Sequence, residues 1–306
     1  LIKLKKIPRF GSKISNNLSH IISSIYMKYW KPDIIHKTFF NNHSYKNQSA
    51  KKILNVWDLN HEIYHDLYKR NKDWRPKKIA LGQADHIICS SDKTQRDLAK
   101  YYNFDLKKTS VVYQGVNEYE NPQGIQHNKH KYLLYVGSRL KYKNFDNLLR
   151  ALSINKQILE DFKLICFGEE RINPIEKELI KKLDLNEKNI LFISGNDLML
   201  REYYLKSTAL IYPSKNEGFG FPPLEAMSFG CPVITSNNSA IIEATNLLDY
   251  SFDPNSPRDM AVKIENIIYS KTAINHLISH GLQRIKKLSW QHTTSEVLDV
   301  YKKILS

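Results

Sequence analysis

One stretch of the chain, residues 209–235, limits the possible folds more strongly than any other. Two short apolar runs, 209–212 and 232–235, enclose a loop rich in glycine and proline and then a short helical pattern. Pro222 and Pro223 suit only the first turn of that helix, because proline lacks an N–H group and has a fixed φ. Gly230 is suited to end the helix. The stretch therefore predicts a strand, a loop, a helix and a second strand, in that order.

The loop and the start of the helix combine glycines with two carboxylates. Gly218 and Gly220 flank Phe219, so the backbone can approach a ligand closely. A helix N-terminus behind such a loop offers free N–H groups and a positive dipole end, which favour a phosphate. Glu217 and Glu225 would be unfavourable there unless they met hydroxyls or positive charge. The alternative is an ordinary connection between a strand and a helix.

The segment E-G-F-G-F-P-P-L-E, followed by A-M-S-F-G-C-P-V-I, resembles the E-x7-E motif of the retaining nucleotide-sugar glycosyltransferases of family four. These enzymes have the GT-B fold. The resemblance implies that Glu225 accepts hydrogen bonds from the ribose hydroxyls of the nucleotide, and that Glu217 faces the transferred sugar. It also implies that the backbone amides of Phe219, Gly220 and Phe221 contact the sugar hydroxyls and the distal phosphate.

A basic segment, V-G-S-R-L-K-Y-K-N, follows a predicted strand at residues 136–144. Gly137 permits close approach of the backbone, and Arg139 and Lys143 place positive charge at a strand end, where a diphosphate would lie. The segment resembles the diphosphate-binding Arg…Lys segment of the family. Gly137 and Ser138 are therefore candidate donor-binding residues, and Arg139 and Lys143 would stabilise the leaving diphosphate. The alternative is a solvated turn rich in lysine.

Two more small residues, Gly168 and Gly195, follow further predicted strands. The resemblance makes both candidate donor-binding residues, because this fold usually holds the nucleotide base at these positions. Small residues also end strands for purely structural reasons, so that alternative stays open.

The segment V-W-D-L-N-H-E, at residues 56–62, places Asp58 and His61 just after a predicted strand. It resembles a segment of a family branch that includes mannosyl- and rhamnosyl-type transferases, which makes Asp58 and His61 candidate catalytic residues. Trp57 occupies the position where many relatives carry a histidine that contacts the donor sugar. As alternatives, Asp58 caps a helix and His61 lies on a helix surface.

The alternation of apolar runs and helical patterns predicts an α/β protein with two Rossmann-like, doubly wound parallel-sheet domains facing a cleft, as in GT-B enzymes. Strands are expected at 34–36, 52–57, 84–90 and 109–113, and then at 132–136, 163–167, 189–193, 208–212 and 232–235. The segment 117–131 contains no periodic apolar pattern and is the expected linker. Residues 119–289 are accordingly expected to form the nucleotide-sugar-binding domain.

Residues 1–118 are expected to form the acceptor-side domain, and the resemblance implies that the final helix, at 290–306, packs back on it. Members of the family begin with a short strand and a Gly-rich loop, and no such pattern precedes Pro32. The spacing of apolar residues in 14–30 instead predicts a helix. The N-terminal domain is therefore expected to be incomplete.

The sequence contains no Asp-x-Asp pair and no His/Cys cluster at the spacing of metal ligands. It also lacks the G-x-G-x-x-G pattern of dinucleotide-binding folds. We therefore expect no metal and no other cofactor, with basic side chains and a helix dipole neutralising the diphosphate. The three cysteines are far apart in apolar surroundings, which indicates buried free thiols in a reducing cytoplasm.

The net charge of +15 is compatible with nucleic acid, an anionic membrane surface or an anionic substrate. The densest basic cluster, at 69–78, surrounds Trp74 and suits lipid headgroups or, equally, a nucleic-acid phosphate backbone. No apolar run is long enough to span a membrane. A cytoplasmic protein is expected, in possible peripheral contact with the inner face of the membrane through 69–78, and nucleic acid is not an expected partner.

Together these features predict a retaining glycosyltransferase that moves a hexose from a nucleotide-diphosphate sugar to a hydroxyl acceptor. GDP-mannose is the first choice of donor and a UDP-sugar the second. The expected acceptor is a polysaccharide or a lipid-linked glycan intermediate. The alternative is an inactive module with the transferase fold that binds nucleic acid or an anionic surface.

Overall fold

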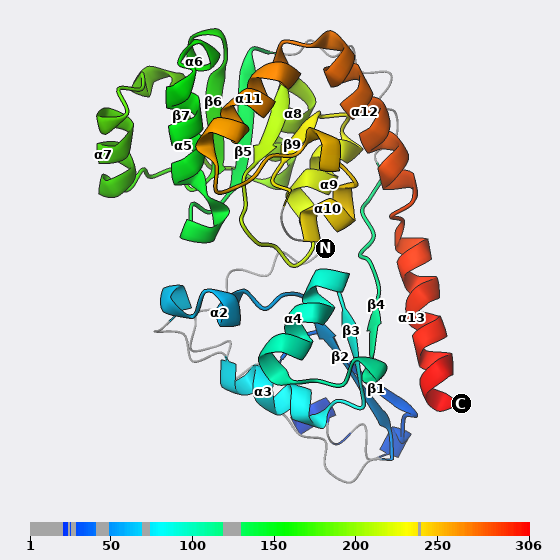
Figure 1. The fold of residues 1–306 in the computed structure, drawn as a ribbon. Helices are drawn as coiled ribbons and strands as arrows, with labels where there is room; N and C mark the ends of the chain where they lie inside the picture. The colour runs from blue at the N-terminus through cyan, green and yellow to red at the C-terminus, as the bar shows by residue number, and fades with distance from the viewer. Residues whose placement is uncertain are drawn as a thin grey trace.

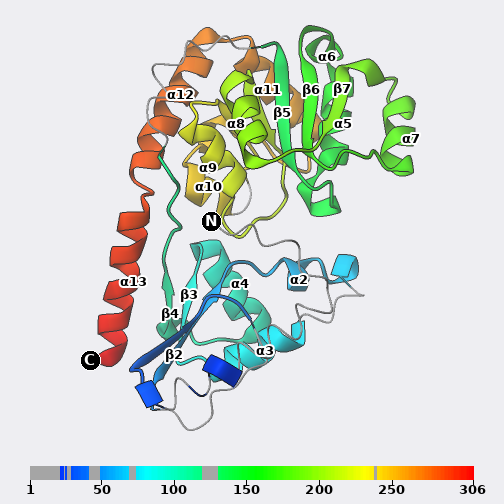
Figure 2. The same ribbon diagram turned by 180° about the vertical axis from the view of Figure 1, so that it is seen from behind.

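The computed structural model describes residues 21–23, 25, 29–40, 49–68, 74–118, 130–237 and 240–306. These residues form two domains, each built on a parallel β-sheet, one above the other in Figures 1 and 2. The described residues between 21 and 30 are helical, as the apolar spacing predicts. The rest of that predicted helix and most of the expected linker lie outside the described residues.

The sheet of the first domain has the order β1-β2-β3-β4, and each neighbouring pair of strands is parallel. Its strands are β1 (Ile34–Lys37), β2 (Lys51–Val56), β3 (His86–Cys89) and β4 (Thr109–Val111). The helices that connect them are α2 (Asn60–Ile63), α3 (Trp74–Gln83) and α4 (Asp92–Tyr102), with short 3-10 turns at His65–Tyr68 and Leu106–Lys108. Alternate residues of the strands are buried on opposite faces, so the sheet is covered on both sides.

The sheet of the second domain has the order β7-β6-β5-β8-β9 and is also parallel. Its strands are β5 (Tyr132–Gly137), β6 (Lys163–Gly168), β7 (Ile190–Ile193), β8 (Ala209–Tyr212) and β9 (Val233–Thr235). Because the strand order reverses between β5 and β8, their carboxyl ends form the switch point at which doubly wound sheets bind ligands. The basic segment follows β5, and the loop with Glu217 follows β8.

The helices of the second domain cover both faces of its sheet and enclose the largest apolar core. They are α5 (Phe145–Ile154), α6 (Gln157–Asp161), α7 (Pro174–Lys182), α8 (Asp197–Lys206), α9 (Phe221–Ser228), α10 (Ala240–Thr245), α11 (Pro257–Ile268) and α12 (Lys271–Lys286). Short 3-10 turns lie at Lys141–Lys143, Glu187–Asn189 and Leu248–Tyr250. Helix α9 begins at the prolines, as expected, and the turn after it contains Gly230 at a φ of 64°.

The last helix, α13 (Trp290–Leu305), follows α12 and runs beside the sheet of the first domain (Figures 1 and 2). Its Val300 packs with Ile53, Ile88 and Val112 on one face of that sheet. The Tyr301 hydroxyl lies 2.6 Å from Nδ1 of His36. The end of the chain therefore contributes to the core of the first domain. In the part of the chain that the structure describes, no helix combines the length and apolar character of a membrane span.

Candidate active site

A pocket of about 350 Å³ lies between the two domains, at the switch point of the second sheet. The first domain contributes Trp57, Asp58, Ser90 and Gln114 to its lining, and the second contributes Lys143, Tyr212 and residues 217–222. Among the predicted site residues, the structure thus brings together Glu217, Lys143, Asp58 and the three residues Phe219, Gly220 and Phe221. They come from segments far apart in the sequence, which is typical of a ligand site between domains.

Glu217 is the centre of the polar network in this pocket. Its Oε1 accepts hydrogen bonds from Lys143 Nζ at 2.7 Å, Tyr212 OH at 2.9 Å and Ser214 Oγ at 2.5 Å. The side chains of Lys143 and Glu217 are 14% and 11% exposed, so the ion pair is largely removed from solvent. Burial raises the pKa of Tyr212 well above its usual value, which keeps this hydroxyl a hydrogen-bond donor. The network fixes one cation and one carboxylate at the pocket wall.

Gly218 brings the second domain into direct contact with the first. Its carbonyl oxygen lies 2.9 Å from Ser90 Oγ, which also lies 2.6 Å from the carbonyl oxygen of Trp57. A Cβ at Gly218 would be 1.9 Å from that same Trp57 oxygen and 2.8 Å from Asp58 Cβ. Nearby, Asn216 Nδ2 donates to Asn60 Oδ1 at 2.7 Å. The absence of a side chain at Gly218 therefore permits the two domains to close on each other.

A second contact between the domains involves Glu243 on α10. Its carboxylate accepts hydrogen bonds from the backbone N–H groups of Asp92 and Lys93, at 2.7 and 2.9 Å, and Arg96 Nη2 donates to it at 3.1 Å. These amides form the N-terminus of α4, where a carboxylate is electrostatically favoured. Burial nevertheless raises the pKa of Glu243. This contact could not be predicted from the sequence, because it joins residues about 150 positions apart.

The glycine loop and the start of α9 form one wall of the pocket. Gly220 has a φ of 102°, which disfavours any residue with a Cβ. The Phe219 ring is 4% exposed and stacks on Tyr113 at a centroid distance of 5.6 Å. Phe221 begins the helix and is 37% exposed. This arrangement suits the predicted amide contacts at Phe219, Gly220 and Phe221, which stay predictions.

The remaining predicted donor-binding residues lie along the carboxyl edge of the second sheet, outside the lining of this pocket. Gly137 and Gly168 end β5 and β6 side by side, with φ values of 123° and 145°, and a Cβ on Gly168 would be 2.7 Å from the Gly137 oxygen. The Ser138 carbonyl accepts a hydrogen bond from Tyr135 OH at 2.9 Å. Gly195 directly precedes the N-cap of α8.

Glu225 faces helix α8 rather than Glu217. Its Oε2 accepts a hydrogen bond from the Tyr204 hydroxyl at 3.2 Å. Burial raises the pKa of the Glu225 carboxyl, and the nearby charge of Asp197 adds to this effect. The two glutamates of the motif therefore lie in different surroundings: one is paired with a lysine and the other with a tyrosine. A separate role for each is compatible with this difference.

The side chain of Arg139 lies away from the pocket, so its predicted role at the diphosphate stays a prediction. Its side chain is 2% exposed, and its Nε donates to Glu176 Oε1 at 2.9 Å. Its other nitrogens donate to the backbone oxygens of Glu169 and Arg171. The guanidinium also lies 4.8 Å from the centroid of the Phe192 ring. Arg139 therefore connects β5 to the region around α7 and does not line the pocket.

Replacing Arg139 with methionine is expected to lower the free energy of unfolding by about 3–5 kcal/mol, because it leaves the buried Glu176 carboxylate without its cation. Urea denaturation followed by circular dichroism measures the change. Arg150→Met, at an exposed position on α5, serves as the control and is expected to change stability little. Unchanged stability together with lost nucleotide binding would instead support the predicted role of Arg139 at the leaving diphosphate.

Asp58 lines the pocket, whereas His61 lies one helical turn further on and lines a neighbouring pocket. Asp58 is not the N-cap of α2, since that residue is Leu59, but its Oδ1 accepts a hydrogen bond from the Asn60 N–H at 3.0 Å. This bond fixes the loop that follows β2. Tyr212 and Ser90 also line the pocket, although neither was among the predicted site residues. Their positions next to strand ends are the signal that could have identified them.

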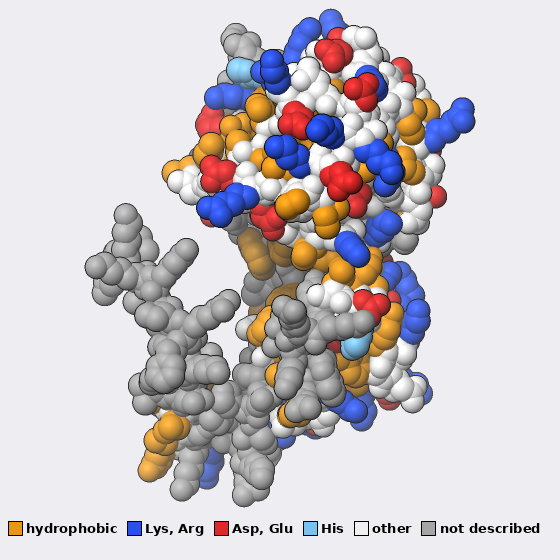
Figure 3. All heavy atoms as spheres, turned by 90° about the vertical axis from the view of Figure 1, so that its left-hand side faces the viewer, with side chains coloured by type: hydrophobic (Ala, Val, Ile, Leu, Met, Phe, Trp, Pro, Cys, Tyr) orange, Lys and Arg blue, Asp and Glu red, His pale blue; other side chains and the backbone are white. Residues whose placement is uncertain are grey.

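The basic cluster at 69–78 does not form one exposed surface. Lys77 is buried, and its Nζ donates to Glu62 Oε2 at 2.9 Å. Lys78 is exposed, while the other basic side chains of the cluster lie outside the described residues. On the face shown in Figure 3, basic and acidic side chains are interspersed over the second domain. Among the described residues, no group of three or more His, Cys, Asp or Glu side chains is arranged to hold a metal ion.

Two parallel-sheet domains with a pocket between them define the GT-B class of fold. A glycosyltransferase structure from Rickettsia africae matches 100% of this chain and 84% of its own, with a TM-score of 0.71 and 22% identity. Sucrose-phosphate synthase from Thermosynechococcus elongatus matches 99% of this chain and 81% of its own, with a TM-score of 0.74 and 18% identity. At these identities the likeness concerns the fold.

Residues 117–284 match the sequence profile of the family "Glycosyl transferases group 1", and residues 5–119 match that of "Glycosyltransferase Family 4". The chain belongs to the group 1 glycosyl transferases. The O-antigen chain mannosyltransferase RfbU of Salmonella typhimurium is 28% identical over 219 residues, which are 69% of this chain and 60% of RfbU. O-antigen chain mannosyltransferase B of Escherichia coli is 27% identical over 256 residues, 83% of this chain and 61% of the relative. The chain thus spans about three fifths of the length of these relatives.

Proposed function

We propose that this protein transfers a hexose from a nucleotide-diphosphate sugar to a hydroxyl acceptor with retention of anomeric configuration. The observation that carries the proposal is the Lys143–Glu217 pair in the pocket between the domains, beside the glycine loop and the N-terminus of α9. A cation, a carboxylate and free backbone amides at one wall are the groups that a diphosphate and a sugar with hydroxyls require.

In the proposed reaction, the bond between the anomeric carbon and the diphosphate oxygen breaks, and its electron pair leaves with the diphosphate. The acceptor hydroxyl oxygen forms the new bond to the anomeric carbon on the same face, and its proton passes to the departing phosphate. Lys143 stabilises the negative charge that develops on the leaving group. Glu217 positions Lys143 and faces the transferred sugar, and closure of the domains excludes water. No metal is part of the proposal.

GDP-mannose is the proposed donor, because several of the similar proteins are named mannosyltransferases. A UDP-sugar is the second choice, since a structure of similar fold from Anabaena contains UDP and glucose. The proposed acceptor is a polysaccharide or a lipid-linked glycan at the cytoplasmic side of a membrane. The O-antigen names of the relatives support this class of acceptor.

A thermal-shift panel with GDP-, UDP- and ADP-sugars tests the proposal. One nucleotide is expected to stabilise the protein, by about 2.7 kcal/mol at a hundredfold excess over its dissociation constant. Glu225→Ala should remove most of this stabilisation, because the resemblance assigns this residue to the ribose that every nucleotide in the panel carries. Glu178→Ala, at an exposed position on α7, should leave it unchanged.

Product analysis by NMR completes the test, since it shows whether the anomeric configuration of the sugar is retained. No response to any nucleotide, together with DNA binding that weakens steeply with salt, would instead support an inactive module that binds nucleic acid.

A further inference from the structure

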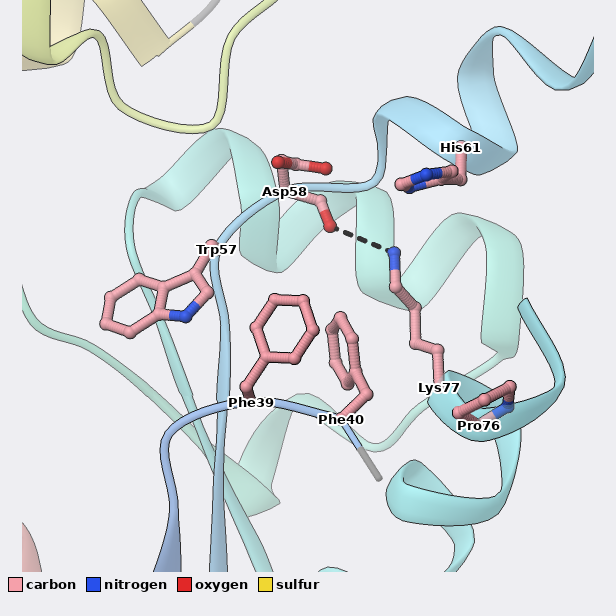
Figure 4. A pocket seen from close by; sticks show the side chains of 7 residues that line it. All are labelled: Phe39, Phe40, Trp57, Asp58, His61, Pro76 and Lys77. Carbon is pink, nitrogen blue, oxygen red and sulfur yellow. Dashed lines mark hydrogen bonds between the residues drawn. The ribbon is translucent and has the colours of Figure 1, made fainter. Parts of the chain in front are cut away.

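A second pocket, of about 190 Å³, lies in the first domain next to the pocket between the domains (Figure 4). Trp57 and Asp58 line both pockets, so the two share one wall. The rest of the second pocket combines the rings of Phe39 and Phe40 with the polar side chains of His61 and Lys77. Phe40 and Lys77 also support the fold of the first domain, whereas the exposed Phe39 ring has no part in its core or in the proposed donor site.

The aromatic wall of this pocket is only partly covered by protein. Phe39 is 65% exposed, and its ring lies 5.3 Å from that of Phe40, centroid to centroid. Trp57 Nε1 donates to the carbonyl oxygen of Thr38 at 2.8 Å, which fixes the orientation of the indole beside them. In Figure 4, Phe39 lies between Trp57 and Phe40. An exposed ring in a fixed surround is suited to stack on a flat ligand face.

The polar wall is held in place by a buried ion pair. Lys77 Nζ, with its side chain 3% exposed, donates to Glu62 Oε2 at 2.9 Å and to the backbone oxygen of Asp58 at 3.2 Å. Tyr102 OH donates to the other oxygen of Glu62 at 2.5 Å. The segment that carries Asp58 is thereby attached to α3 and α4. The Asp58 carboxylate therefore has a fixed position between the two pockets.

We propose that this second pocket binds the acceptor as a pyranoside, which stacks its C–H face on Phe39 and Trp57 and directs one hydroxyl past Asp58 into the first pocket. A pyranoside has one apolar face and a polar rim, which matches an aromatic wall opposite a carboxylate and an imidazole. A lipid chain would leave the carboxylate of Asp58 desolvated without a partner for its charge. The proposal rests on the proposed transferase function, because it assigns the acceptor side of the same reaction.

Saturation-transfer NMR with four methyl glycosides tests the proposal: α-D-mannopyranoside, α-D-glucopyranoside, α-D-galactopyranoside and α-L-rhamnopyranoside. At least one is expected to bind the wild-type chain. Phe39→Ala should weaken that binding about tenfold, since it removes one stacking face. Phe39→Tyr, which keeps the ring, should restore it. Tyr101→Ala, at an exposed position on α4 outside both pockets, is the matched control and should bind like the wild type.

The thermal shift given by GDP or UDP is measured on the same variants, so that the two proposals fail separately. An unchanged nucleotide shift with weakened glycoside binding in Phe39→Ala supports the acceptor pocket. If no nucleotide stabilises the wild type, the transferase proposal fails, and the glycoside series still decides whether the pocket binds sugar. Equal glycoside binding by wild type and Phe39→Ala, or no binding of any glycoside, would overturn the acceptor pocket. The acceptor pocket would also be overturned if Phe39→Ala weakened the binding of n-decyl phosphate but did not weaken the binding of any glycoside.

Discussion

Replacing Lys143 with methionine is expected to lower kcat/KM by roughly 10²–10³-fold, the usual effect of removing one group that stabilises a leaving anion. Among the described residues that line the pocket, Lys143 supplies the positive charge. Methionine keeps most of the apolar stem and removes only the ammonium group. The measurement is the initial rate with the nucleotide-sugar that gives the largest thermal shift.

A stability effect must be separated from the catalytic one, because Lys143 Nζ is paired with Glu217 Oε1 at 2.7 Å in a largely buried position. The single variant leaves this carboxylate without its cation, which costs about 3–5 kcal/mol in comparable buried pairs. The double variant Lys143→Met/Glu217→Gln contains neither charge, and Tyr212 and Ser214 can still donate to the glutamine oxygen. We expect it to recover most of the stability and none of the activity.

Lys141→Met is the matched control for this series, since it removes a lysine from the same 3-10 turn at an exposed position. Its rate and stability should equal those of the wild type. A double variant that recovers activity along with stability would show that the lysine is needed only to neutralise Glu217. The assignment of Lys143 to the leaving group would then be wrong.

The fold could be predicted from the sequence because the strands of the second domain are nearly continuous apolar runs, and those of the first domain contain shorter ones. Parallel strands covered on both faces require such runs, and the observed strands lie within two residues of the expected ones. The association of Lys143 with Glu217 could also be anticipated, although the two are 74 positions apart. Each follows a strand at the switch point of the sheet, so topology alone brings them together.

The orientation of the Arg139 side chain could not be predicted from the sequence. A basic residue after a strand can face the ligand or the body of the domain, and the choice depends on partners elsewhere in the chain. Here Glu176 lies 37 positions away, and its Oε1 accepts from Arg139 while its Oε2 completes a capping box with Asn173. A carboxylate that a helix terminus places inside the domain attracts the guanidinium. Nothing in the sequence near Arg139 indicates this.

The contacts between the two domains could not be predicted from the sequence either. Gly218 was predicted to approach a ligand. In the structure, the space that a side chain at this position would need is occupied by the backbone of Trp57. The glycine does permit a close approach, as predicted, but the group that approaches it is the first domain and not a ligand. Its position in the closed structure therefore gives a direct way to test how much activity depends on closure of the two domains.

Replacing Gly218 with alanine is expected to prevent this closure and to lower kcat/KM about a hundredfold, the effect of misplacing reacting groups by roughly 1 Å. The new Cβ would lie 1.9 Å from the Trp57 carbonyl oxygen and 2.8 Å from Asp58 Cβ, so the loop and the first domain must move apart. Gly218 has no left-handed φ, so alanine introduces no backbone strain of its own. Small-angle X-ray scattering should show a larger radius of gyration, with an unchanged far-UV circular dichroism spectrum.

Gly82→Ala is the matched control for Gly218→Ala, because a Cβ at that exposed position on α3 meets nothing within 4 Å. It should leave both scattering and rate unchanged, and helix propensity favours a slight gain in stability. An open Gly218→Ala protein with a normal rate would mean that Asp58 and the rest of the first domain are dispensable for the reaction. A compact protein with a reduced rate would instead place the effect in the glycine loop and its ligand. Only the combination of an open form and a lost rate assigns catalysis to the pocket that both domains build.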